Sequence, residues 1–185
     1  RTDSSAASDV YKRQDIDDDG DLDIISADGS GDKILYHIND GTPGNGAWTT
    51  NTVISGSDAD GAMSVHVADI DSDGDLDIVA ALFMTSHVVW IENDGSPNNG
   101  GWTSHDVVSS SDSKESYDVT VADIDGDGDL DILEADQSNK IYWYENDGTP
   151  DDGTWSMTKI KGGLTDAHVV ATADLDNDGD IDVIS

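Results

Sequence analysis

The sequence predicts an all-β fold made of β-propeller blades, each a sheet of four antiparallel strands. Short runs rich in β-branched and aromatic residues recur along the chain and are too short for helices. A nine-residue acidic phrase occurs four times and begins at residues 15, 69, 123 and 174, so the repeat length is 54, 54 and 51 residues. Four short strands in a repeat of about 50 residues are typical of a propeller blade. The 185 residues amount to about three blades, fewer than the four to eight that close a propeller. We therefore expect an incomplete part of a larger propeller.

The first 14 residues do not follow the repeat. Arg13 stands where the other repeats have a small or apolar strand residue, and a charged side chain is costly to bury there. The segment also resembles a translated sequencing adapter, so we treat it as an added tag. We expect residues 1–14 to be a non-native or disordered leader that packs poorly, and residues 15–185 to form the propeller part. Its blade units are predicted over about 15–62, 63–115 and 116–166, with a partial unit at 167–185.

The acidic phrase is the strongest functional signal in the chain. It has aspartate at positions 1, 3, 5, 7 and 9, glycine at position 6, and an aliphatic residue at positions 2 and 8. Unit charges a few ångströms apart repel by about 1 kcal/mol per pair even in water, so a cation among these carboxylates would stabilise the loop. Oxygen ligands without Cys or His indicate Ca²⁺ rather than zinc or copper. The alternative, a solvated acidic turn without metal, is weakened by four copies in register.

Glycine at position 6 permits the sharp turn that lets positions 1, 3 and 5 converge. The aliphatic pair of each phrase is expected to anchor its loop onto a core. We expect about one Ca²⁺ per loop, up to four in all. The predicted metal ligands are Asp15, Asp17, Asp19, Asp21, Asp23, Asp69, Asp71, Asp73, Asp75, Asp77, Asp123, Asp125, Asp127, Asp129, Asp131, Asp174, Asp176, Asp178, Asp180 and Asp182.

Strands are predicted on both sides of each acidic phrase. A short apolar run precedes three of the phrases, and a second strand follows at residues 24–27, 78–81 and 132–135. A third strand is predicted at residues 33–38, 87–92 and 140–145. The turn Asn-Asp-Gly-Thr/Ser-Pro comes next, and a fourth strand starts near Trp48, Trp102 or Trp155. An EF-hand fits worse because it needs flanking helices and a glutamate at position 12. A calcium β-roll would repeat every nine residues, which this chain does not.

The composition is strongly acidic and lacks cysteine. Asp and Glu number 41 against 8 Lys and Arg, for a net charge of −33. Most of the acids are Asp, which favours turns, rather than Glu, which favours helices. Four bound Ca²⁺ would leave a net charge of about −25, so nucleic acid and anionic membranes are poor partners. No apolar run approaches the roughly 20 residues of a membrane span, so we expect no membrane insertion.

These loops carry a family resemblance. Each is left by Asp-Ile-Ile/Val-type residues, and three are entered from a Val-x-Val-Ala-type strand. In this they resemble FG-GAP/VCBS-type propeller repeats, which also build the head of integrin α-subunits. The resemblance covers about residues 15–185. It implies a calcium loop between the first and second strands of each blade, with the carboxylates of positions 1, 3, 5 and 9 and the carbonyl of position 7 as ligands. Phe-Gly and Gly-Ala-Pro pieces are missing, so the likeness is to the VCBS-like branch rather than to integrins.

The remaining motifs favour binding over catalysis. No nucleophile elbow, phosphate loop or zinc signature occurs, and the histidines fall at different repeat positions. The recurring aromatics are interpreted as blade packing rather than as a glycan-stacking surface; they are Tyr36, Trp90, Trp143, Trp48, Trp102 and Trp155.

We therefore expect a calcium-binding, non-catalytic module of a secreted or cell-surface protein that serves adhesion, glycan recognition or protein recognition. Its partners would be an extracellular glycan or protein and the remaining blades of the parent chain. The alternative is the propeller portion of a secreted calcium-dependent polysaccharide lyase or other carbohydrate-active enzyme. A cluster of Lys, Arg and His on one face of the full propeller would favour that alternative.

Overall fold

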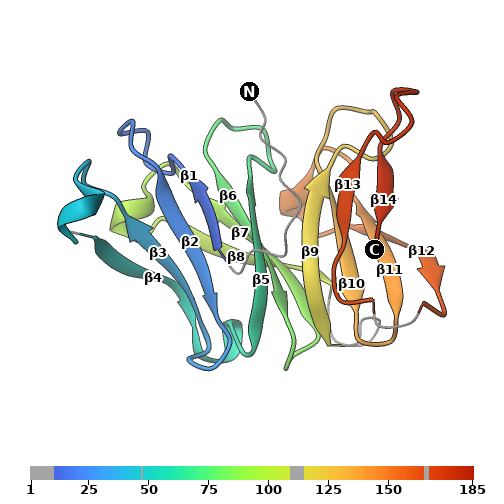
Figure 1. The fold of residues 1–185 in the computed structure, drawn as a ribbon, viewed down its shortest axis with the longest axis horizontal. Coiled ribbons are helices and arrows are strands. Elements are labelled where there is room, and N and C mark those ends of the chain that lie inside the picture. Colours follow the sequence, from blue (N-terminus) through green and yellow to red (C-terminus); the bar gives the residue numbers. More distant parts are fainter. Residues whose placement is uncertain (1–10, 47, 109–114, 165–166) are drawn as a thin grey trace.

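The chain folds into consecutive antiparallel sheets. The computed structural model describes residues 11–46, 48–108, 115–164 and 167–185. Three four-stranded sheets, which we call blades 1, 2 and 3, and a two-stranded sheet follow one another along the sequence (Figure 1). Within each sheet the strands pair in chain order. The helical segments of the described residues are four single turns of 3-10 helix, and no helix among them is long and apolar enough to cross a membrane. The predicted all-β blade architecture is confirmed.

The strand bounds agree closely with the sequence prediction for the second and third strands. Blade 1 contains β1 (Tyr11–Gln14), β2 (Asp23–Asp28), β3 (Lys33–Ile38) and β4 (Thr49–Ser55). Blade 2 contains β5 (Ala62–Ala68), β6 (Asp77–Leu82), β7 (His87–Asn93) and β8 (Trp102–Val108). Blade 3 contains β9 (Ser116–Ala122), β10 (Asp131–Asp136), β11 (Lys140–Glu145) and β12 (Ser156–Gly162). The last sheet pairs β13 (Ala171–Ala173) with β14 (Asp182–Ile184), and the 3-10 turns are η1 (Pro43–Asn45), η2 (Gly56–Asp58), η3 (Pro97–Asn99) and η4 (Pro150–Asp152).

Residues 11–14 differ from the expectation that they lie outside the blades. Their strand β1 pairs with β2, with Arg13 opposite Ile24 and Gln14 opposite Asp23. The Gln14 side chain also donates a hydrogen bond to the carbonyl of Val67 in blade 2, at 3.1 Å. Ladder hydrogen bonds are made by backbone groups that every non-proline residue carries, so an atypical side-chain pattern does not prevent pairing. Residues 1–10 and the side chains of residues 11–13 lie outside what the structure describes.

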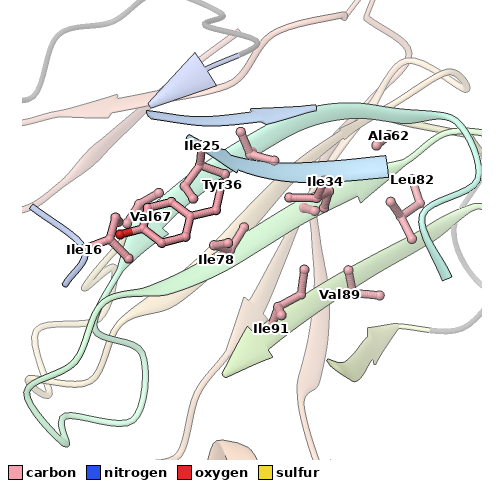
Figure 2. Packing of buried hydrophobic residues seen from close by; sticks show 12 residues of the cluster. Ile16, Ile25, Ile34, Tyr36, Ala62, Val67, Ile78, Leu82, Val89 and Ile91 are labelled. Carbon is pink, nitrogen blue, oxygen red and sulfur yellow. The ribbon is translucent and has the colours of Figure 1, made fainter. Parts of the chain in front are cut away.

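The apolar core lies between neighbouring blades. One cluster joins blade 1 to blade 2 and includes Ile25 and Tyr36 on one side and Val67, Ile78 and Val89 on the other (Figure 2). A second cluster joins blades 2 and 3 in the same way. Successive strand residues point to opposite faces, and a blade between two others buries both faces. The central strand β6 is accordingly buried at each of its positions.

The aliphatic residues of the acidic loops take part in these contacts between blades. Ile16, at position 2 of the first phrase, shares a cluster with Leu76, at position 8 of the second. Ile70 shares the next cluster with Leu130 in the same way. The outer members of the series, Leu22 and Leu175, are 59% and 61% exposed. The pair that we expected to anchor one loop on one core therefore connects consecutive loops instead.

Five of the six recurring aromatic side chains also pack between blades. Tyr36 and Trp90 are fully buried, and the ring of Trp102 meets that of Tyr36 edge-on at a centroid distance of 6.3 Å. Trp143 and Trp155 pack against the other two clusters. Because aromatic side chains bury a large area, they contribute strongly to such contacts. This supports packing rather than glycan stacking for these five residues, whereas Trp48 lines an open pocket on blade 1.

Candidate metal centres

Each acidic phrase forms the turn between the first and second strands of its sheet, as the sequence resemblance implied. We call these turns loop 1 (15–23), loop 2 (69–77), loop 3 (123–131) and loop 4 (174–182). They lie along one edge of the array of sheets, at the top of Figure 1. The four loops are therefore presented on a common side of the molecule.

All four loops fold through the same hydrogen bonds. The position-1 carboxylate accepts a bond from the glycine amide at position 6, at 3.1 to 3.2 Å. The position-5 carboxylate accepts from the amide at position 7, at 2.8 to 3.0 Å. The glycine has φ between +96° and +104° in every loop, a conformation that other residues rarely adopt. The loop backbone thus wraps around its own aspartates.

The position-9 aspartate is buried in the three blades and holds the loop to the sheet. Asp77 is fully buried and accepts hydrogen bonds from the amides of Ile70 at 3.1 Å and Asn93 at 2.8 Å. Asp23 and Asp131 make the equivalent bonds. Burial raises the pKa of Asp77 to about 7 although the two amides act to lower it. Burial raises the pKa of Asp23 and Asp131 as well.

An asparagine in each Asn-Asp-Gly turn supports the loop, and the sequence prediction missed this role. The Asn93 side chain donates to the carbonyl of Leu76 in loop 2 at 3.2 Å and accepts from the amide of Gly95 at 3.2 Å. Asn39 and Asn146 repeat both contacts in blades 1 and 3. This role could have been predicted from the sequence, because asparagine recurs at the start of the same turn in three repeats.

The structure gathers some of the predicted ligands and separates others. In loops 1 and 3 the carboxylates of positions 1, 3 and 5 have oxygens within 4.8 Å of one another. In loops 2 and 4 the clustered carboxylates are those of positions 1, 3 and 9. The position-7 side chains belong to none of these groups. Asp21, Asp75 and Asp129 lie instead against turn glycines, so that a Cβ added at Gly95 would stand 2.7 Å from an Asp75 oxygen.

Several clustered oxygens lack a partner. Asp15 Oδ1, Asp17 Oδ1 and Asp69 Oδ1 are buried without a hydrogen bond. Buried polar atoms in native proteins are nearly always satisfied, and an unpartnered carboxylate is costly. A cation held among these oxygens would supply the missing interaction, and a set of carboxylate ligands fits a hard ion such as Ca²⁺.

Loops 1 and 2 also adjoin the 3-10 turn of the following blade. Asn98 of η3 donates a hydrogen bond to the position-3 carboxylate of loop 1, Asp17 Oδ2, at 2.7 Å. Asp151 of η4 occupies the equivalent place beside loop 2. Burial raises the pKa of the position-3 carboxyl there, Asp71, and the negative charges of Asp73, Asp69 and Asp151 add to the rise. These two loops are therefore junctions between blades as well as turns within one.

Ser26, His37 and Thr50 form a chain of polar side chains on blade 1. Ser26 Oγ lies 2.8 Å from His37 Nε2, and Thr50 Oγ1 lies 2.9 Å from His37 Nδ1. Burial lowers the pKa of His37, and an open pocket of about 430 Å³ lies beside this group. However, a threonine stands where a carboxylate would orient a catalytic histidine. In blade 2 the matching residues Ile78, Ala80 and Ile91 pack against blade 1, so this face resembles a packing face.

Sheets of this kind, with an acidic loop after the first strand, define a propeller repeat protein. The FG-GAP-like repeat matches residues 15–80, 81–134 and 132–185, and the chain belongs to this family. Solved structures share its fold, among them the following two. BBS1N, in a crystal structure of its complex with ARL6DN, is 13% identical with a TM-score of 0.54, and the match covers 91% of this chain and 47% of that one.

The second structure is a lectin from Agrocybe aegerita that specifically recognises non-reducing terminal N-acetylglucosamine. It is 21% identical with a TM-score of 0.58, and the match covers 94% of this chain and 46% of the lectin. The chain therefore spans a little under half the length of either protein. No curated protein sequence matches it significantly.

Proposed function

We propose that the chain is a calcium-binding, non-catalytic propeller module that recognises a glycan or a protein outside the cell. The observation that carries the calcium part is the fourfold repetition of one loop geometry with clustered carboxylates. The unpartnered oxygens in loops 1 and 2 support it further. Each loop would hold about one Ca²⁺ through the oxygens that it gathers, and the ion would offset their repulsion.

The recognition part is supported by the fold and by what similar folds bind. The lectin binds a terminal sugar and BBS1N binds a protein, so one scaffold serves both kinds of ligand. The net charge of −33 disfavours nucleic acid and anionic membranes. An extracellular location follows from the calcium proposal, because weak sites of about 10⁻⁴ to 10⁻³ M are filled outside the cell, where such modules work. Binding of the calcium-loaded protein to a glycan array, reduced by a chelator, would support the sugar branch of the proposal.

Calorimetric titration tests the metal assignment directly. We expect Ca²⁺ to bind the folded chain. The double change Asp71→Asn and Asp73→Asn should remove binding at loop 2, because it neutralises Asp71, a member of the carboxylate cluster, and Asp73, a second predicted ligand. The matched control changes Asp58 and Asp60 to Asn, which removes the same charge outside any acidic loop. Equal calcium binding by the two double variants, or no binding by the native protein, would contradict the assignment.

A further inference from the structure

A second kind of metal-ligating cluster lies outside the acidic loops, between blades 2 and 3. Glu92 on β7, His105 on β8 and Asp151 in η4 have ligand atoms that all lie within 4.8 Å of one another. His105 Nε2 is 2.8 Å from Glu92 Oε2. Two of the residues come from blade 2 and the third from blade 3, so only the docking of the blades brings them together.

The surrounding structure fixes the position of each group. The His105 ring stacks on Trp90 at a centroid distance of 4.5 Å and an interplanar angle of 21°, and Trp90 is fully buried. β7 and β8 pair with Trp90 opposite His105, which sets Glu92 and His105 at diagonal positions. Asp151 directly follows the buried Pro150 at the start of η4. The imidazole nitrogen is therefore held toward both carboxylates.

The charges of this group are not balanced by protein alone. Glu92 is paired with His105, whereas Asp151 makes no hydrogen bond or ion pair with the residues that the structure describes. Asp71 of loop 2 adds negative charge nearby. The other blades do not repeat the arrangement, because the place of His105 is taken by Asn51 in blade 1 and by Thr158 in blade 3. The cluster is thus separate from the fourfold calcium pattern.

We propose that Glu92, His105 and Asp151 bind one Zn²⁺, or a similar divalent transition metal ion, at the junction of blades 2 and 3. An imidazole with two carboxylates is a donor set that suits zinc better than calcium. Three protein ligands leave a fourth position for water or for a group on a ligand. Because the ion is held by both blades, its binding opposes their separation. This site does not depend on calcium binding by the loops.

The test is a titration of zinc into the full chain in excess calcium, followed by calorimetry. We expect one zinc ion per chain and a rise in melting temperature on binding. His105→Ala and Asp151→Asn should each weaken zinc binding by at least about tenfold, the size of effect that even outer hydrogen-bond partners of metal ligands have. Calcium binding by the acidic loops should be unchanged in His105→Ala. Asp151 is exposed, so its substitution is not expected to disturb folding.

His87→Ala is the matched control. His87 Nδ1 lies 3.4 Å from Asp106 Oδ1 across the same two strands, but this pair belongs to no three-ligand group among the described residues. The variant should bind zinc as the native protein does. Cobalt absorption gives a second readout, since bands from a bound imidazole should disappear in His105→Ala. Absence of zinc binding, or equal affinity in the native protein and both ligand variants, would overturn the proposal.

Discussion

Removal of calcium is expected to lower the melting temperature of the protein sharply. Without an ion, each loop holds clustered carboxylates whose mutual repulsion opposes the turn. The loops connect the first two strands of every sheet, and most of their aliphatic residues lie in the clusters between blades. Loss of one ion should therefore weaken a blade and its contact with the next blade together.

The expected size follows from mass action. An ion that binds only the folded chain stabilises it by about 2.7 kcal/mol per site at a hundredfold excess over Kd. The stabilisation from several occupied sites together approaches the free energy of unfolding of a whole domain, which is about 5–15 kcal/mol. For a chain of this length, each kcal/mol corresponds to about 2–4 °C in Tm. Thermal melts followed by circular dichroism, with and without a chelator, measure the effect.

Millimolar calcium should restore the melting temperature, whereas magnesium should not. Magnesium is smaller, demands nearly ideal octahedral geometry and gives up its water reluctantly. The calcium-free protein in high salt is a useful control, because salt screens repulsion between exposed charges without filling a site. A melting curve that does not move on chelation would show that the loops are stable as solvated acidic turns.

The sequence predicted the features that repeat, because each repeat is one structural unit. The second and third strands, the position of the acidic loops and the aromatic packing all followed from residues at fixed spacing. The contacts between repeats could not be found in this way. Asp118 accepts hydrogen bonds from Ser64 Oγ at 2.6 Å and from the Val170 amide at 2.9 Å, in the blade before and the sheet after its own.

These partners stand 54 and 52 residues from Asp118, and no local pattern indicates a pairing over that distance. Aspartate is rarely buried, so the residue type at this position predicted an exposed side chain rather than a buried contact between blades. The same reason explains why Asn98 beside loop 1 and Asp151 beside loop 2 were missed. Each lies in a polar turn whose partner is known only once the blades are docked. The pairing of β1 was missed because the side chains of residues 11–14 were given more weight than their backbone.

Asp77→Asn is expected to destabilise the protein although it keeps the shape of the side chain. Both carboxylate oxygens of Asp77 accept backbone hydrogen bonds in a fully buried position. An asparagine offers one oxygen, so its amino group would face the amide of Ile70 or Asn93 and leave that donor unpaired. An unsatisfied buried donor costs about 1–3 kcal/mol. Urea denaturation measures the loss, and Asp58→Asn, an exposed change in η2, should leave stability nearly unchanged.

The pH dependence of the stability lost in Asp77→Asn identifies the cause of that loss. Burial raises the pKa of Asp77 to about 7 in the folded chain, well above the value of about 4 for an exposed aspartate. The folded state therefore holds this proton more tightly than the unfolded state. Its contribution to stability is fully present below about pH 4 and is lost as the pH rises through about 7. In the presence of a chelator, the free energy of unfolding of the native protein should fall more over this pH range than that of Asp77→Asn. The difference in stability between the two proteins should therefore narrow as the pH rises. A stability difference that does not change with pH would mean that Asp77 is already charged at the lower pH. The loss of stability in Asp77→Asn would then come from its hydrogen bonds alone and not from its proton.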